Sequence, residues 1–241
     1  MSSIFYVGDI HGQVDALGDV VQKAEALDDS STPATAIVQV GDFGWGFSDK
    51  RLERWLEKRA RQRKWSVPIY TCLGNHDNWY RLEELRSAAG SPSVFELAPG
   101  SGCFYVARGA CIELGGINHL FLGGAESTDK HGRTEGVDWW RTEQPSAMEF
   151  DHFFYALASE EPEVVVTHEA PLRVRLERSG RETSMTPKML EQAMLLSDHR
   201  PARWYFGHHH VRQCWQMGET DFYGCGLHGE YWRWPLETVT D

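Results

Sequence analysis

Five short runs of β-branched and aromatic residues each lead into a polar turn that carries glycine or histidine. Apolar runs of this length, bounded by turn residues, are typical of buried strands that end in loops. The runs are IFYV before GDIHG, AIVQV before GDFGWG, PIYTC before LGNHD, EVVVT before HEAP, and RWYF before GHHH. The pattern therefore predicts five buried strands, each followed by a polar loop.

Helical patterns occupy much of the chain between these strands. Residues 14–27 and 49–65 separate the first three runs, and the second stretch carries apolar residues at helical spacing. Further helical patterns cover residues 145–159 and 187–197. Strands that alternate with helices in this way predict an α/β fold.

The pattern changes between residues 95 and 125. Three strand-like pieces, CFYVA, ACIEL and HLFLGGA, follow one another with glycine-rich turns and without room for helices. We expect an antiparallel section here. CWQM and DFYGCG near the C-terminus also predict strands. Together these patterns predict two facing mixed β-sheets flanked by helices.

Composition describes an ordinary globular chain. The 241 residues are 41% hydrophobic and 24% charged, and no composition shift or linker divides them, so we expect a single domain over residues 1–241. No apolar run is long enough to span a bilayer, and the N-terminus lacks the pattern of a signal peptide. Five cysteines without a Cys-x-x-Cys pair favour reduced thiols. A cytoplasmic location is therefore expected.

The formal net charge of −11 argues against an extended surface for nucleic acid, because such binding depends on lysine and arginine neutralising phosphates. Residues 172–187 form the one arginine-rich stretch, LRVRLERSGRETSMTP, which lacks a clear period. Both a mobile functional loop and a plain solvated loop fit this stretch.

Polar side chains follow each of the five predicted strands. In open α/β sheets ligands gather beyond the carboxyl ends of the strands, so these side chains are expected to form one site. They are Asp9, His11, Asp42, Asn75, His168, His208 and His210. Each motif alone also fits an ordinary polar turn or capping residue. A buried cluster of so many polar groups, however, would be costly unless it held metal, and the mixed oxygen and nitrogen donors suit manganese, iron or zinc.

Spacing supports part of this grouping. Residues two apart on an extended segment project to the same side, so Asp9 pairs with His11 and His208 with His210, while His209 should face elsewhere. Glycines precede the ligand segments and would let the backbone turn sharply. These glycines are Gly8, Gly41, Gly74 and Gly207.

The motifs GDIHG, GDFGWG, GNHD, VVVTHEAP and GHHH closely resemble the calcineurin-like metallophosphoesterase signature, over residues 8–210. The resemblance implies a four-layer sandwich with its active site at the C-terminal strand ends. It also implies two divalent ions, manganese or iron with zinc as an alternative. Asp9, His11 and His210 would bind one ion, Asn75, His168 and His208 would bind the other, and Asp42 would bridge both.

The resemblance further implies an enzyme that hydrolyses a phosphomonoester or small phosphodiester by a hydroxide bridging the two ions. His76 would be the general acid that protonates the leaving group. Asp77 would orient the His76 ring and favour the imidazolium. The alternative for Asp77 is a cap on the helix that starts near Asn78.

The central segment GGAESTDKHGRTEGVDWW resembles one found in small bacterial and phage-type members of the superfamily. Within it, Asp129, His131 and Arg133 either contact substrate or form a plain polar turn. The second motif departs from the Asp-Arg-Gly ending of the phosphoprotein-phosphatase branch. There Trp45 is expected either to stack a base or aryl leaving group, or to pack the loop.

The expected partner is a small phosphorylated substrate, without a membrane and without extended nucleic acid. Two alternatives keep the same metal chemistry, a nuclease and a phosphoprotein phosphatase. A third, of another class, is a non-catalytic interaction module that has lost its metals. The sequence gives no indication of the oligomeric state.

Overall fold

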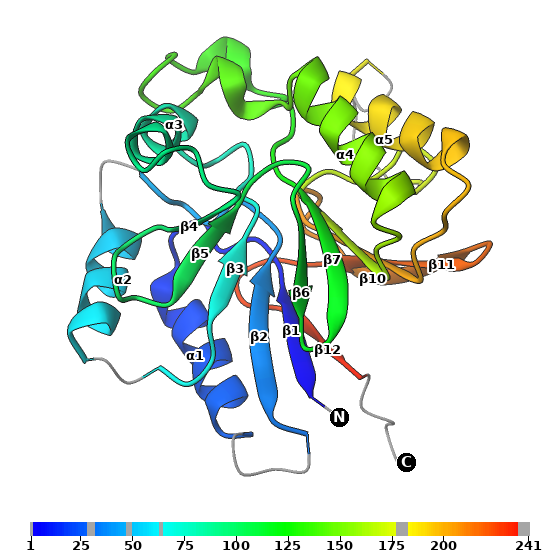
Figure 1. Cartoon of the computed structure of the whole chain (residues 1–241). Coiled ribbons are helices and arrows are strands. Elements are labelled where there is room, and N and C mark those ends of the chain that lie inside the picture. The colour runs from blue at the N-terminus through cyan, green and yellow to red at the C-terminus, as the bar shows by residue number, and fades with distance from the viewer. Residues whose placement is uncertain (1, 28–31, 47–49, 63–64, 177–182, 236–241) are drawn as a thin grey trace.

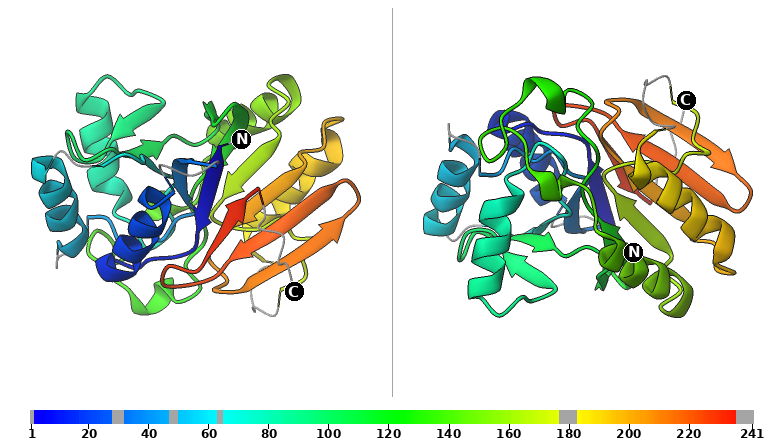
Figure 2. Two further views of the ribbon diagram at one scale, coloured as in Figure 1. Left: turned by 90° about the horizontal axis from the view of Figure 1, so that it is seen from below. Right: turned by 90° about the horizontal axis from the view of Figure 1, so that it is seen from above.

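The computed structural model describes residues 2–27, 32–46, 50–62, 65–176 and 183–235. Two six-stranded mixed sheets face each other, and helices cover the outer face of each (Figures 1 and 2). This arrangement is the four-layer α/β sandwich expected from the sequence. None of the helices in these ranges is long and apolar enough to cross a membrane.

The first sheet has a parallel centre and antiparallel edges, with strand order β12-β1-β2-β3-β5-β4. Its strands are β1 (Ser3–Val7), β2 (Ala34–Gln39), β3 (Ile69–Thr71), β4 (Val94–Glu96), β5 (Cys103–Val106) and β12 (Tyr231–Trp234). Three helices pack on its outer face: α1 (Val14–Glu25), α2 (Arg51–Gln62) and α3 (Trp79–Ala88).

The second sheet repeats this plan, with strand order β10-β11-β9-β8-β7-β6. Its strands are β6 (Cys111–Leu114), β7 (Ile117–Leu122), β8 (Val164–Thr167), β9 (Arg203–Phe206), β10 (Arg212–Met217) and β11 (Thr220–Cys225). Its outer face is covered by α4 (Ala147–Ser159) and α5 (Met185–Leu196). Two short 3-10 turns, η1 (Lys130–Gly132) and η2 (Arg141–Glu143), lie between β7 and α4.

The space between the sheets is filled by side chains from both inner faces. Tyr6 of β1 stacks on Tyr205 of β9 with ring centroids 3.5 Å apart, and Phe121 and Val166 pack into the same buried cluster. These strands are buried on both faces, which is why they are continuous apolar runs in the sequence rather than alternating ones.

The predicted antiparallel section is wrong in one respect. β4 pairs with β5, and β6 pairs with β7, both antiparallel, but β5 and β6 belong to different sheets. The chain crosses between the two sheets there. The predicted loop 172–187 is described only at its ends, with Met185 to Pro187 already in α5, and residues 177–182 lie outside the described residues.

Candidate metal centre

The polar loops that follow β1, β2, β3, β8 and β9 meet at one edge of the two sheets, because parallel strands end there together. Two groups of possible ligand atoms form, with all atoms of a group within 4.8 Å of one another. One group is Asp9, His11, Asp42 and His210, and the other is Asp42, His168 and His208. Asp42 is therefore common to both.

Individual contacts show how closely these side chains converge. His210 Nε2 lies 3.2 Å from Asp9 Oδ2 and 3.2 Å from His11 Nε2. On the other side of the site, His168 Nε2 lies 3.2 Å from Asp42 Oδ1. The amide oxygen of Asn75 is 3.1 Å from the same His168 nitrogen, which brings Asn75 to the second group. All the ligand residues expected from the sequence thus lie in one cluster.

The backbone reaches this geometry through turns rather than extended strands. His11, Asp42, His208 and His210 have φ values of 48°, 52°, 64° and 54°, in the left-handed region that non-glycine residues seldom adopt. These segments are therefore not extended, contrary to the backbone conformation expected from the sequence. The expected orientation of His209 nevertheless matches the structure, since His209 turns away and its Nε2 lies 2.5 Å from Glu169 Oε1.

Glycines serve this site mainly by leaving space. A Cβ on Gly74 would lie 2.2 Å from Asp42 Oδ1, and one on Gly207 would lie 2.2 Å from Asp9 Oδ1. Gly8 is similarly close to the backbone of Gly226. Among the four expected turn glycines, Gly41 alone has a left-handed φ, of 104°. The other three allow close approach rather than a sharp turn.

The charges of the site favour a bound cation. Asp9 and Asp42 are buried carboxylates, and burial raises the pKa of Asp9. Burial also acts to raise the pKa of Asp42, but His168 holds it well below its usual range. In the same way, burial would lower the pKa of His168, but the Asp42 carboxylate outweighs it and raises this pKa to about 9. The Asp42 carboxylate thus stabilises a positive charge at the centre of the site, and a bound metal ion would replace the proton of His168 there.

Hydrogen bonds orient the second group toward a cation. The ring of His168 places Nδ1 2.9 Å from the carbonyl oxygen of Val40, so Nδ1–H donates there and Nε2 faces the site. These donors, carboxylate and amide oxygens with imidazole nitrogens, fit the borderline divalent ions expected from the sequence.

His76 lies at the edge of this cluster, and its backbone N–H donates to Asp42 Oδ1 at 2.7 Å. The two terminal nitrogens of Arg133 lie 3.3 Å and 3.1 Å from Nδ1 and Nε2 of the His76 ring. Burial lowers the pKa of His76, and Arg133 adds to this effect, while Asp42 opposes it. The neutral imidazole is therefore favoured when Arg133 occupies this position.

Asp77 differs from both sequence expectations. Its buried carboxylate accepts hydrogen bonds from the backbone N–H groups of Gly74, Phe43 and Trp45. Within the described residues it makes no hydrogen bond to the His76 ring, and the cap of α3 is Asn78, which accepts from Arg81 N. Asp77 instead joins the loop after β3 to the loop after β2.

Trp45 is 1% exposed and packs in the core beneath the first sheet, so the expectation that it stacks a substrate ring is wrong. The other reading, that it packs the loop, is correct, and the Arg81 guanidinium lies 5.1 Å from its ring.

Arg133 lies at the edge of the cluster, where its guanidinium meets the ring of His76. Its guanidinium is also bound by Asp129 Oδ2 at 2.8 Å and by the carbonyl oxygen of Asp138 at 3.0 Å. His131 is exposed on η1. The segment between β7 and α4 therefore places the Arg133 guanidinium at the edge of the cluster.

Two residues that sequence reasoning missed hold Asn75 in place. Asn75 Nδ2 donates to Ser127 Oγ at 3.0 Å, and Ser127 Oγ donates to Glu143 Oε2 at 2.7 Å. Burial raises the pKa of Glu143, and the Ser127 donors oppose this. Ser127 follows β7, so the rule of polar residues after strands would have found it. Glu143 lies far from any strand end and carries no such signal.

Glu169 was also missed, although it follows His168 directly. It is 3% exposed, and its Oε2 lies 3.7 Å from His208 Nε2. A buried carboxylate beside a ligand histidine commonly fixes the orientation of that ring.

Comparison with solved structures finds other proteins with a similar fold. One solved structure superposes with a TM-score of 0.58 at 12% identity, covering 96% of this chain and 93% of its own. A putative 5′-nucleotidase from Staphylococcus aureus gives a TM-score of 0.53 at 16% identity over 96% of this chain, which spans 50% of that protein. The phosphopantetheinyl hydrolase from Mycobacterium tuberculosis gives 0.46 at 15% identity, covering 95% and 91% of the two chains.

At these identities the first two matches show a similar fold and nothing more. The third has a TM-score below 0.5 and supports no conclusion. A comparison with curated proteins finds no match. The sequence model of one family, described as calcineurin-like phosphoesterase, matches residues 2–212. That range contains every ligand residue of the two groups, and the chain belongs to the calcineurin-like phosphoesterase family.

Proposed function

We propose that this chain hydrolyses a small phosphoester, a monoester or a small diester, with two divalent metal ions. The observation that carries the proposal is the position of Asp42, which belongs to both ligand groups. A carboxylate at the centre of two such groups is suited to contact two ions at once. Manganese or iron fits the donors best, with zinc as an alternative.

The residues would divide as follows: Asp9, His11 and His210 hold one ion, Asn75, His168 and His208 hold the other, and Asp42 contacts both. When bound, the two ions supply positive charge and Lewis acidity, which activate water and stabilise charge on a phosphoryl group. The formal charge of −11 over the whole chain is no obstacle, because the local field at the site would be set by the ions.

Arg133 and His76 would act on the substrate. Arg133 is a cation at the edge of the cluster, suited to bind a phosphoryl oxygen. An anionic phosphoryl group would attract the Arg133 guanidinium away from the His76 ring. The charge of Arg133 would then no longer lower the pKa of His76, which favours the imidazolium. His76 could then donate its proton to the leaving oxygen. Asp77 has no direct part in this step, because its carboxylate is occupied by backbone N–H groups.

The test of His76 compares leaving groups. The His76→Ala variant should hydrolyse esters with poor alkoxide leaving groups far more slowly than the unaltered protein does. Hydrolysis of p-nitrophenyl esters, whose phenolate leaves unaided, should be affected less, and the two rate losses should differ by a factor of about 10² to 10⁴. Metal content should not change. His131→Ala, an exposed histidine on η1, is the matched control and should behave as the unaltered protein.

Equal slowing of both ester types, with both ions bound, would remove His76 from the mechanism. Failure of the unaltered protein to cleave any ester with added Mn²⁺ would favour the non-catalytic alternative. Cleavage of single-stranded nucleic acid or of a phosphoprotein in preference to small esters would favour the nuclease or the phosphoprotein phosphatase.

A further inference from the structure

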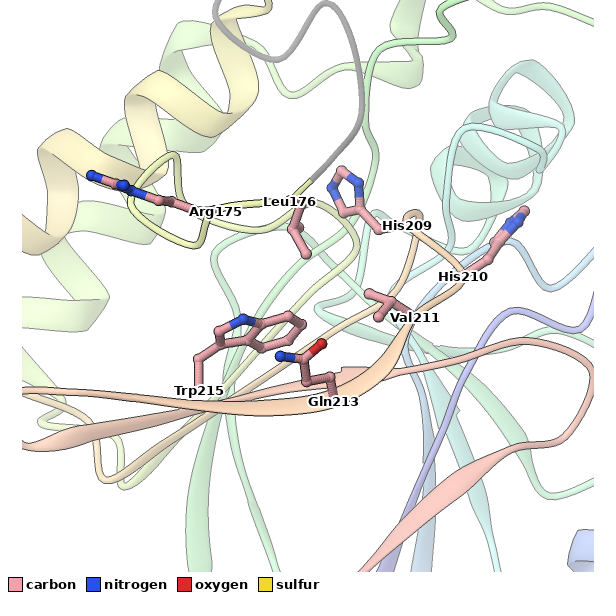
Figure 3. Close-up of a pocket in the computed structure, with 7 residues that line it drawn as sticks. All are labelled: Arg175, Leu176, His209, His210, Val211, Gln213 and Trp215. Carbon is pink, nitrogen blue, oxygen red and sulfur yellow. The ribbon is translucent and has the colours of Figure 1, made fainter.

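A groove of about 640 Å³ lies beside the candidate metal centre. It runs between β10 and the segment at Arg175 and Leu176, and one of its ends is formed by His209 and His210 (Figure 3). His210 is also a candidate ligand, with Nε2 3.2 Å from Asp9 Oδ2. The groove and the metal centre thus share a wall.

One side of the groove is a face of β10. Gln213 and Trp215 are two residues apart on this strand, and Val211 lies two residues before Gln213. The three side chains therefore point to the same side, as Figure 3 shows. The Trp215 ring lies against the Phe206 ring, with ring centroids 5.8 Å apart. Leu176 projects toward Gln213 and Trp215 from the opposite side (Figure 3).

This lining has a definite chemical preference. Leu176, Val211 and the flat Trp215 ring form apolar walls suited to a flat aromatic ring. Gln213 offers both a donor and an acceptor, which can pair with neighbouring donor and acceptor atoms on the edge of a nucleobase. A volume of about 640 Å³ lies in the range of small-molecule sites.

We propose that this groove binds the nucleobase of a nucleoside phosphoester whose phosphoryl group lies at the metal centre. The inference rests on the proposed function for the position of the phosphoryl group. The aromatic partner that the sequence suggested at Trp45 is then supplied by Trp215, because Trp45 is buried while Trp215 lines the groove.

The test uses two competitors, adenosine 5′-monophosphate and ribose 5-phosphate, which carries a hydroxyl group in place of the base. Each is titrated as a competitor of p-nitrophenyl ester hydrolysis by the Mn²⁺-loaded protein. The adenine compound should bind at least about tenfold more tightly, as expected for stacking of a base on an aromatic ring. Trp215→Ala and Gln213→Ala should reduce this preference without changing the inhibition by ribose 5-phosphate. Gln216→Ala is the matched control, because Gln216 is exposed and lies on the other face of β10.

Equal inhibition by the two competitors, or an unchanged preference in Trp215→Ala, would overturn the groove assignment while leaving the phosphoesterase function intact. Absence of any p-nitrophenyl ester hydrolysis would instead refute the proposed function. In that case, binding of adenosine, measured by saturation-transfer NMR, decides the groove separately. Binding that is lost in Trp215→Ala supports the assignment, and no binding overturns it.

Discussion

Ser127 provides a sharp test of how the second ligand group is held. Its hydroxyl accepts from Asn75 Nδ2 at 3.0 Å and donates to Glu143 Oε2 at 2.7 Å, and all three residues are buried. Ser127→Ala removes both hydrogen bonds and leaves a buried amide and a buried carboxylate without these partners. Each such group costs about 1–3 kcal/mol, so the free energy of unfolding should fall by roughly 2–6 kcal/mol.

The loss should also reach the metal site. Without Ser127 the Asn75 amide is no longer fixed with its oxygen toward His168, and loss of an outer partner typically weakens metal binding by about 10- to 100-fold. Calorimetric titration with Mn²⁺ should therefore show one weakened ion and one unchanged ion. Urea unfolding of the metal-free protein measures the stability term separately.

The matched control is Ser101→Ala. Ser101 is also buried, and its hydroxyl accepts a hydrogen bond from Cys103 N at 3.2 Å, away from the ligand groups. It should lower stability without changing either metal affinity. A folded Ser127→Ala protein that binds both ions with unaltered affinity would refute the proposed role of Ser127.

Two further predictions concern histidines. Burial lowers the pKa of His119 from 6.5 to about 4, and its ring nitrogens lie within hydrogen-bonding distance of Tyr6 Oη and the carbonyl oxygen of Ile117. In the unfolded chain His119 takes up a proton as the pH falls below 6.5, whereas in the folded protein it stays neutral down to about pH 4. The contribution of His119 to the free energy of unfolding is present in full above pH 6.5 and declines as the pH falls toward 4. At pH 5 it is about 2 kcal/mol smaller than at neutral pH. In urea unfolding with chelator, His119→Gln should lose less stability between pH 7 and 5 than the unaltered protein, and parallel curves would contradict this. His209→Ala should retain two ions in elemental analysis while His208→Ala should not, and the reverse pattern would overturn the ligand assignment.

Local patterns predicted the strands and the site because both depend on short stretches of sequence. An apolar run such as residues 164–167 is typical of a strand buried on both faces, and a polar residue after it is expected at the edge of the sheet. The sequence pattern alone therefore predicted that His168, directly after this strand, lies at the sheet edge. The sequence also marked where helices separate the parallel strands.

The incorrect predictions concern contacts between distant segments. Whether β5 and β6 pair depends on which sheet each joins, which the runs themselves do not specify. Trp45 lies near the ligands in sequence, yet it points into the core against elements contributed by other parts of the chain. Asp77 was expected to orient the His76 ring, but its carboxylate accepts from backbone N–H groups of its own loop and of the loop after β2. Each outcome was decided by tertiary packing rather than by local sequence.

The central claim is that Asp42 serves two metal ions, and the metal content of Asp42→Ala tests it most directly. Asp129→Ala is the control, because Asp129 is an exposed carboxylate outside both ligand groups. After equilibration with Mn²⁺ and removal of free metal, elemental analysis should give two ions per chain for the unaltered protein and for Asp129→Ala. Asp42→Ala, with folding verified by circular dichroism, should retain neither ion, because the shared ligand is lost and the two cations then repel each other. Two ions per folded Asp42→Ala chain, bound with unaltered affinity, would contradict the account.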